Sequence, residues 1–299
     1  MKLFLAGTKG RSFITEKIIG DNMKVFLTGG NYKNAVVDKI MEDTMRIFIA
    51  GEHPVKNGPL ADWSVEKLNI LESYYYARNN KHIQRLISAM PRDRLMVDSG
   101  AHTFHKGVIK TDWDKYTEEY AEFVVKHDVD IYVEMDIDIV VGLDKVEKLR
   151  DKLESITKKK CLPVWHVNRG KQYFFDMCDE YDYVGIGGLT DKTVRHKTAK
   201  YFPWFIAEAH RRGAKIHGFA FTGTDIVNYG FDSVDSTSWL YGNRGGFLYH
   251  FDGRGLKKIP KPAGTRMKSK EVAFHNFNEW VKFGHYMETV HNYSYLNKE

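Results

Sequence analysis

From about residue 90 to residue 240, short apolar runs alternate with longer amphipathic segments, and this alternation constrains the fold more than any other feature. Short apolar runs bounded by turn residues are typical of buried β-strands, and a spacing of three or four between apolar residues is typical of helices. Regular alternation of the two favours an α/β protein with a parallel sheet. We expect strands at Leu95–Asp98, Ile131–Asp136, Leu162–His166, Tyr183–Gly187, Lys215–Ala220 and Ser233–Asp235, and helices at Asp112–His127, Leu143–Lys159, Lys171–Asp179, Lys192–Arg212 and Thr224–Tyr229.

The first sixty residues contain an internal repeat. The heptapeptide Met1-Lys2-Leu3-Phe4-Leu5-Ala6-Gly7 recurs with few changes from Met23 and from Met45. Each copy predicts a strand and a glycine turn, and short helices are expected at Phe13–Asn22 and Ala35–Thr44. Three such units are too few for a solenoid, so we expect them to add parallel strands to a larger sheet.

Six strands after residue 90, with two or three before it, favour a (β/α)8 barrel of the TIM type. The chain is interpreted as a single domain, with βα repeats over 1–60, a catalytic core over 90–250, and a basic segment and C-terminal helix over 253–299. Ala61–Met90, which includes Tyr74-Tyr75-Tyr76, and Lys270–Tyr295 both read as helical. In the second of these, Phe274, Phe277 and Val281 share one face, as core residues do. An open doubly wound sheet is the alternative, although no Gly-x-Gly-x-x-Gly turn follows an early strand.

Composition excludes several classes of protein. With 42% hydrophobic and 28% charged residues, the chain is expected to be globular. Its apolar runs are too short for a membrane span or a secretory signal, so a cytoplasmic location is expected. The two cysteines, Cys161 and Cys178, are too few for a disulfide framework or a four-thiolate zinc site, and we expect both to be small apolar core residues.

The net charge of +6 points weakly to a polyanionic partner. The segment Gly253–Lys270 has seven basic residues and no acidic one, and is either a solvated loop or a phosphate-contacting segment. The basic residues are Arg254, Lys257, Lys258, Lys261, Arg266, Lys268 and Lys270.

Polar residues or glycines stand at or just beyond the ends of six successive expected strands. In a (β/α) barrel the carboxyl ends of all strands open on one face, where active sites lie. A single aspartate there is often a helix N-cap, and a single histidine is often a core residue, but the whole set predicts a shared site. Two of the aspartates suit glycosidic-bond chemistry, because one can attack the sugar carbon while the other handles the proton of the leaving base. The set is Asp98, Asp136, His166, Gly187-Gly188, His217 and Asp235.

Taken in order, these phrases resemble those of the tRNA-guanine transglycosylase superfamily over about residues 90 to 250. The phrases are Val97-Asp98-Ser99-Gly100-Ala101, Tyr132-Val133-Glu134-Met135-Asp136, Ile186-Gly187-Gly188-Leu189 and Gly230-Phe231-Asp232-Ser233-Val234-Asp235, with His166 where the family usually has a glutamine. The chain lacks the cysteines of the family's zinc subdomain and is shorter than the tRNA enzymes. It is therefore more similar to the compact, phage-type DNA 7-deazaguanine transglycosylases (the DpdA-like branch).

The resemblance implies a role for each matched position. Asp235 is the expected nucleophile and Asp98 the acid and base. Asp136 would bind the N1–H and amine edge of guanine, and His166 with the backbone near Gly187, Gly188 and Leu189 would hold the O6 side. His102 and His217 would stack on the ring. The expected phosphate contacts are Arg244, Arg254, Lys257 and Lys258.

The resulting expectation is an enzyme that exchanges guanine, in DNA rather than tRNA, for a 7-deazaguanine such as preQ0, with no metal and no cofactor. A tRNA-guanine transglycosylase is one alternative. Another is a metal-dependent barrel hydrolase, whose ligands would be His166, His217, Asp98 and Asp235. A third is a nucleic-acid-binding barrel without catalysis.

Overall fold

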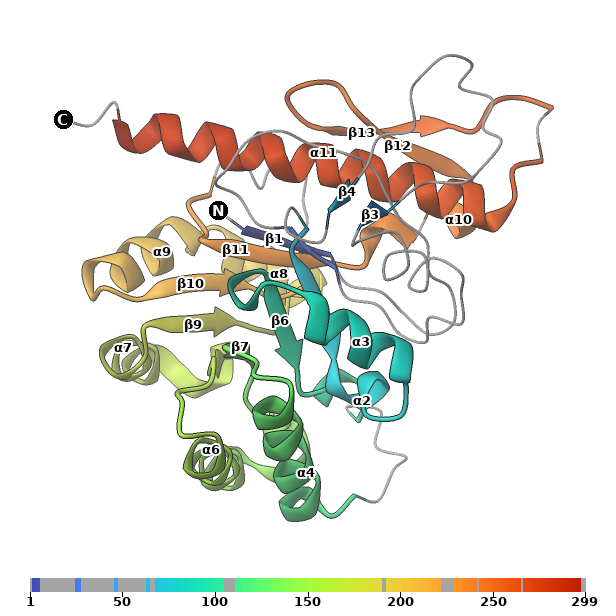
Figure 1. The fold of residues 1–299 in the computed structure, drawn as a ribbon. Helices are drawn as coiled ribbons and strands as arrows, with labels where there is room; N and C mark the ends of the chain where they lie inside the picture. The colour runs from blue at the N-terminus through green and yellow to red at the C-terminus, as the bar shows by residue number, and fades with distance from the viewer. Residues whose placement is uncertain are drawn as a thin grey trace.

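The computed structural model describes residues 2–5, 25–27, 46–47, 63–64, 68–104, 111–189, 192–221, 229–240, 242–264 and 266–296. Over these residues the fold is α/β, with parallel strands and helices packed around them (Figure 1). The expected α/β class is confirmed. The helices expected at Phe13–Asn22 and Ala35–Thr44, and nearly all of that at Thr224–Tyr229, lie outside the described residues.

The main sheet has nine strands in the order β7-β6-β5-β1-β11-β10-β9-β8, with β2 paired to β1. All of its pairings are parallel. The strands are β1 (Lys2–Leu5), β2 (Val25–Leu27), β5 (Ile70–Ser73), β6 (Leu95–Asp98), β7 (Ile131–Tyr132), β8 (Val164–Trp165), β9 (Tyr183–Ile186), β10 (Lys215–Gly218) and β11 (Ser233–Ser236).

The two ends of this strand order also contact each other. A further parallel bridge joins Val133, directly after β7, to Leu162, two residues before β8. The Leu162 amide donates to the Tyr132 carbonyl at 2.7 Å, and the Glu134 amide donates to the Leu162 carbonyl at 3.0 Å. Residues that flank β7 and β8 are therefore hydrogen-bonded to each other.

The N-terminal repeat contributes to the sheet only in part. Its first two copies supply β1 and β2, which pair in parallel as expected. In the third copy, β3 (Arg46–Ile47) pairs antiparallel with β4 (Trp63–Ser64) in a separate two-stranded sheet. The expectation of a parallel strand is therefore wrong for the third copy.

The helical interpretation of Ala61–Met90 is also wrong in part. Ile70–Ser73 is strand β5, which lies between β1 and β6, and among the described residues of this range the helices are α2 (Tyr74–Ala77) and α3 (Lys81–Ala89). Leu68, Ile70 and Leu71 are all buried, so this short apolar run fills an interior place in the sheet. Tertiary position has overridden a local pattern that is ambiguous at this length.

Most helices after residue 110 begin and end close to the expected residues. These are α4 (Trp113–Lys126), α6 (Leu143–Thr157) and α7 (Gly170–Glu180). The Asp112 side chain caps α4 by accepting from the Lys115 amide at 3.1 Å. The single helix expected at Lys192–Arg212 is instead α8 (Lys192–Ala199) and α9 (Phe202–Arg211), because proline in the first turn of α9 cannot continue a preceding helix.

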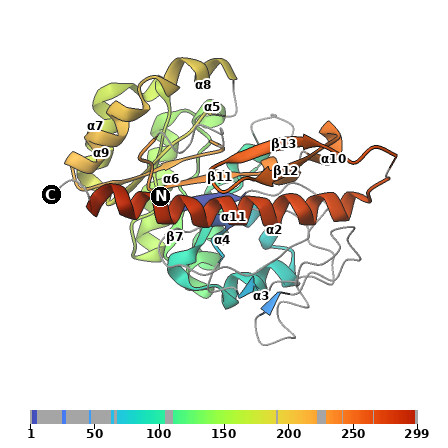
Figure 2. The same ribbon diagram turned by 90° about the horizontal axis from the view of Figure 1, so that it is seen from above.

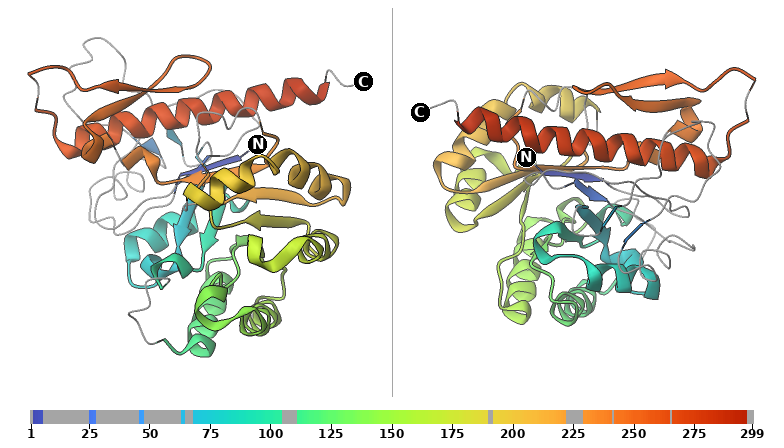
Figure 3. Two further views of the ribbon diagram at one scale, coloured as in Figure 1. Left: turned by 180° about the vertical axis from the view of Figure 1, so that it is seen from behind. Right: turned by 45° about the horizontal axis from the view of Figure 1, so that its top comes forward.

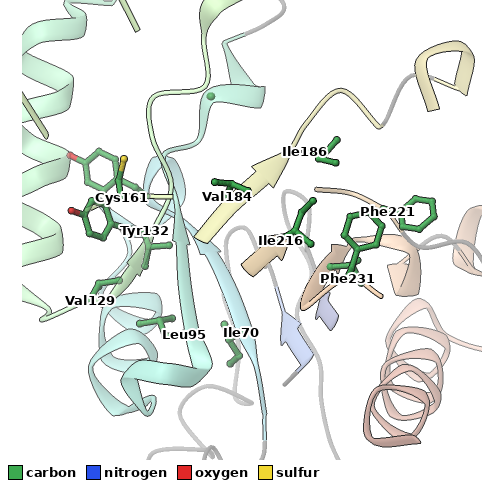
Figure 4. Packing of buried hydrophobic residues seen from close by; sticks show 14 of the residues in the cluster. Ile70, Leu95, Val129, Tyr132, Cys161, Val184, Ile186, Ile216, Phe221 and Phe231 are labelled. Atoms are coloured by element: carbon green, nitrogen blue, oxygen red, sulfur yellow. The ribbon is translucent and has the colours of Figure 1, made fainter. Parts of the chain in front are cut away.

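The core lies between the parallel strands and the helices around them. Ile70, Leu95, Val184 and Ile216 come from four of the strands and are at most 2% exposed (Figure 4). Cys161 and Cys178 are buried free thiols, as expected. Burial raises the pKa of Cys178 to about 12, so this thiol stays protonated and behaves as an apolar side chain.

The C-terminal part adds a hairpin and a long helix. The hairpin strands are β12 (Phe247–Phe251) and β13 (Leu256–Pro260), and the helix is α11 (Ser269–Leu296). Figures 2 and 3 show α11 running past the β1 side of the sheet with the hairpin beside it. Phe277 and Val281 are buried, as expected for the packing face of α11, and the side chain of Phe274 lies outside the described part of the structure. Among the described helices, none combines the length and the apolarity that crossing a membrane requires.

The loop interpretation of Gly253–Lys270 needs correction, because its first part is the turn and second strand of this hairpin. Asp252 organises the turn by accepting from the amides of Arg254 and Gly255, at 3.0 and 2.9 Å. Its carboxylate also pairs with Lys257 at 2.6 Å. An acid just outside the basic segment therefore neutralises one of its lysines.

Candidate functional site

Three carboxylates from separate strands act on one another at the carboxyl ends of the sheet. Asp98 ends β6, Asp235 lies in β11, and Asp136 follows β7. The pKa of Asp98 is raised to about 7, chiefly by burial and to a lesser extent by the negative charges of Asp136 and Asp235, while hydrogen bonds from backbone amides oppose the shift. The charges of Asp136 and Asp235 therefore act on this buried carboxyl group. That the three aspartates form one site stays a prediction of the strand-end pattern.

The turn after Asp98 requires glycine. The Gly100 amide donates to Asp98 Oδ2 at 3.0 Å. Gly100 has φ +87°, and a Cβ there would lie 2.5 Å from the Tyr75 Cβ. The phrase Asp98-Ser99-Gly100 therefore fixes the carboxylate through a backbone shape that other residues do not adopt.

Asp235 is 6% exposed, and one of its oxygens is held from two sides. The Ala220 amide donates to Oδ1. Ala220 has φ +52°, which is uncommon outside glycine and aims this amide at the carboxylate. The second neighbour is His217, whose Nε2 lies 3.5 Å from the same oxygen.

His217 positions Asp235 from inside the sheet. Its side chain is fully buried, and its Nδ1 lies 2.6 Å from Ser233 Oγ, which also bonds the Tyr183 hydroxyl. Burial lowers the pKa of His217, while Asp235 opposes this shift, so the ring is neutral near pH 7. In one consistent arrangement Tyr183 donates to Ser233, Ser233 donates to Nδ1, and Nε2–H points at Asp235. The expected stacking of His217 on a purine does not fit a fully buried ring.

Asp136 and His166 form a close pair, with Oδ1 and Nε2 separated by 2.6 Å. Burial opposes protonation of His166, but the Asp136 carboxylate outweighs it and raises the pKa of the ring. The two side chains are 18% and 15% exposed, so the pair can meet a ligand. Both expected base-binding residues are therefore in contact.

The glycine phrase makes room for this histidine. A Cβ on Gly187 would lie 2.5 Å from His166 Cε1, and one on Gly188 would lie 3.4 Å from Nδ1. The bare backbone that was expected to approach a base thus packs against the His166 ring. Leu189 is 2% exposed and belongs to the core.

A buried ionic network, which was not predicted from the sequence, lies beside the pair of Asp136 and His166. Glu134 is fully buried and pairs with Arg169 at 2.9 Å and Arg150 at 3.1 Å. It also accepts from the Val164 amide at 2.8 Å, which ties the end of β7 to β8. Arg169, in the short helix η4 (Val167–Arg169), continues to Asp138 at 3.2 Å. The sequence does contain a sign of this network, because acidic residues occupy every second position from Glu134 to Asp138.

One group of side chains has the spacing of a cation site. Ligand atoms of Asp136, Asp138 and His166 all lie within 4.8 Å of one another. The guanidinium of Arg169 bonds Asp138 and lies 3.9 Å from Asp136, so it already supplies positive charge there. The cluster differs from the set expected for a hydrolase, since Asp98, Asp235 and His217 are not in it.

The remaining expected residues lie in two groups. The side chains of His102 and Arg244 are outside the described part of the structure. Arg254 is exposed at the hairpin turn, and Lys258 lies over the Phe247 ring at 4.8 Å. Lys257 is held by Asp252.

Comparison with known proteins gives little further guidance. No family model and no curated protein matches the chain. Among solved structures it is similar to the carboxyl transferase domain of Rhizobium etli pyruvate carboxylase with 3-hydroxypyruvate, at 13% identity and a TM-score of 0.36, covering 76% of this chain and 41% of that one. The same domain with oxalate gives 14% identity and a TM-score of 0.35, covering 75% and 40%. The chain thus spans about two fifths of the length of these structures.

Proposed function

We propose that this chain is a guanine transglycosylase that exchanges guanine in a polynucleotide, most simply phage DNA, for a 7-deazaguanine base. The observation that carries the proposal is the coupling of Asp98, Asp136 and Asp235, with Asp98 poised near neutral pH. A carboxyl group with a pKa of about 7 can both give and take a proton under physiological conditions. The phrases that resemble the transglycosylase superfamily contain these same three residues.

Asp235 and Asp98 divide the reaction in two steps. In the first, Asp235 attacks C1′, the C1′–N9 bond breaks, and protonated Asp98 gives its proton to the leaving guanine. In the second, Asp98 takes the N9 proton of the incoming 7-deazaguanine, whose N9 attacks C1′ and releases Asp235. Both neighbours of the Asp235 carboxylate contact Oδ1, so we assign the attack to Oδ2.

The pair Asp136–His166 provides the groups that a guanine edge requires. A carboxylate accepts from N1–H and from the exocyclic amine of the base. A protonated imidazole that donates through Nε2 to Asp136 has its Nδ1–H left for the O6 acceptor. The raised pKa of His166 favours this protonated form.

We further propose that the sheet closes as a (β/α)8 barrel. The bridge between Val133 and Leu162, with its two hydrogen bonds, supports closure between β7 and β8. In such a barrel all strand ends open on one face, which accounts for the coupling between Asp98 of β6 and Asp235 of β11. Phosphates of the polynucleotide would be contacted by Arg244 and by Arg254 and Lys258 of the hairpin.

The decisive experiment measures incorporation of a labelled 7-deazaguanine into DNA and into tRNA. Asp235→Asn should abolish incorporation, while Asp151→Asn, an exposed aspartate of α6, should leave it at the wild-type rate. Mass spectrometry of nucleosides from cells that express the chain then identifies which polynucleotide is modified. Unchanged incorporation with Asp235→Asn would refute the nucleophile, and binding without any incorporation would indicate a non-catalytic barrel.

The cluster of Asp136, Asp138 and His166 supports a second candidate, a metal-dependent hydrolase. Carboxylate and imidazole ligands suit Zn²⁺ or Mn²⁺, which would activate a water molecule. Metal analysis of the purified protein separates the two candidates. Stoichiometric metal that is lost in Asp138→Asn would favour the hydrolase.

A further inference from the structure

A pocket of about 560 Å³ is lined by residues of β8 and of the helices that follow it, and none of the proposed base-exchange residues is among the described residues that line it. We call it the lateral pocket and define it by four aromatic and two basic side chains. It lies between η4, the start of α7, the end of α8 and the start of α9, and Figures 1 and 3 show α7 and α9 together on this flank. The six residues are Trp165, Tyr201, Trp204, Phe205, Lys171 and Lys197.

Aromatic rings make up much of the pocket lining. Trp165 and Phe205 are buried, with ring centroids 4.7 Å apart, and Trp204 packs edge-on against Phe205 at 5.0 Å. Tyr201 is 52% exposed, which is unusual for so large a ring. Exposed aromatic faces of this kind stack on nucleobases of any sequence.

The rim of the pocket carries positive charge. Lys171 and Lys197 are exposed, and none of the described residues that line the pocket is acidic. Lys171 lies over the Trp204 ring at 4.6 Å, and neither lysine forms an ion pair with a described carboxylate. An aromatic ligand that also bears negative charge therefore fits this lining better than a neutral one.

The pocket is adjacent in the chain to the proposed guanine site. His166 of that site is followed directly by η4, and Val167 and Gly170 at the two ends of this turn line the pocket. Val167 follows His166 directly and is 55% exposed, so it presents an apolar side chain at the pocket. A Cβ added to Gly170 would meet no atom within 4 Å, so space is open at this edge.

We propose that the lateral pocket binds one unstacked nucleotide of a single-stranded polynucleotide, with its base against Tyr201 and Trp204 and its phosphate near Lys197 and Lys171. The volume lies in the range of small-ligand sites, which is sufficient for a nucleotide. This inference rests on the proposed function only for the identity of the polynucleotide, which is the strand whose guanine occupies the proposed base-exchange site. Holding a flanking nucleotide would keep that guanine out of the base stack.

The test uses a fluorescein-labelled pentathymidylate and fluorescence anisotropy with the Asp235→Asn protein. The probe has no guanine and the variant has no proposed nucleophile, so binding reports the pocket and not the exchange reaction. Tyr201→Ala should weaken binding about tenfold, and Tyr201→Phe, which keeps the ring, should bind within about twofold of the parent. Tyr201 is exposed, and equal thermal midpoints verify that the variants fold.

The salt dependence tests the phosphate contact. Lys197→Gln should reduce the slope of log K against log salt concentration by about 0.7, the value for one lost phosphate contact in a single strand. Lys148→Gln, an exposed lysine of α6, should leave the slope unchanged. Parent-like binding by Tyr201→Ala, or an unchanged slope in Lys197→Gln, would overturn the proposal. Weakened binding in these variants, together with no detectable base exchange by the wild-type protein, would refute the proposed function and leave the pocket assignment standing.

Discussion

Asp98 has a pKa of about 7 instead of 3.8, so this carboxyl group ionises near physiological pH. Between about pH 4 and pH 7 the unfolded chain has released this proton while the folded chain still holds it. The contribution of Asp98 to the free energy of unfolding is therefore complete below pH 4, falls as pH rises to 7, and is constant above. This is the reverse of the behaviour of an ion-paired carboxylate.

The variant Asp98→Asn isolates this contribution. Relative to the wild type, its free energy of unfolding should be similar at pH 4 and higher by roughly 1–4 kcal/mol at pH 8. Urea unfolding of both proteins over this pH range measures the difference, and other titrating groups cancel in the comparison. A difference that does not change with pH would mean that Asp98 has an ordinary pKa.

His217 is predicted to act through Asp235 and not on the substrate. His217→Phe keeps a ring but removes Nε2, so kcat for base exchange should fall about 10- to 100-fold while KM is unchanged. His217→Gln restores a donor and should recover part of the loss. His210→Gln is the matched control, since His210 pairs with Asp232 at 2.8 Å outside the proposed site. Nitrogen NMR provides a readout independent of activity, and a ring protonated on Nδ1 alone would contradict the proposed arrangement.

At the scale of elements, the glycine turn after β9 packs closely against His166, the residue that follows β8. Gly187→Ala would bring a Cβ to 2.5 Å from His166 Cε1 and 2.8 Å from Nε2, the atom that contacts Asp136, so the ring must shift and this contact is disturbed. We expect a loss of about 1–3 kcal/mol in the free energy of unfolding. In the His166→Ala background the loss should be smaller, because only the contact with Val164 Cγ1 at 2.8 Å remains, and a double-mutant cycle measures this coupling. Gly255→Ala, which meets no atom within 4 Å, should have little effect in either background.

The same elements mark the limit of what the sequence could predict. Leu95–Asp98 was expected as a strand and is one, because an apolar run bounded by turn residues has few alternatives. Ile131–Asp136 was also expected as a strand, but β7 ends at Tyr132. Beyond it Glu134 contacts Arg169 and Asp136 contacts His166, partners that lie 35 and 30 positions later in the chain. Periodicity describes one segment at a time, so it finds the acids but not their partners.

For the whole molecule, the polar residues at strand ends were informative because the carboxyl ends of parallel strands lie at the same edge of a sheet. Residues far apart in the sequence are therefore brought to one edge. Asp98 and Asp235 lie on β6 and β11, with β5 and β1 between these strands in the sheet, and the charge of Asp235 contributes to the raised pKa of Asp98. One strand of that path, β5, was missed in the sequence. The hairpin and the lateral pocket could not be predicted, since each depends on how segments pack and not on their own residues.

Closure of the sheet is the remaining property of the whole molecule, and hydrogen exchange can measure it. If β7 and β8 are joined, the amides of Leu162 and Glu134, which donate at 2.7 and 3.0 Å, should exchange as slowly as the Gly185 amide within the sheet. Such amides open only when the whole fold does. Amides of β13, the edge of a two-stranded hairpin, should exchange much faster and serve as the internal reference. Rapid exchange at Leu162 and Glu134 would show an open sheet with two free edges, and the convergence of strand ends would then need another explanation.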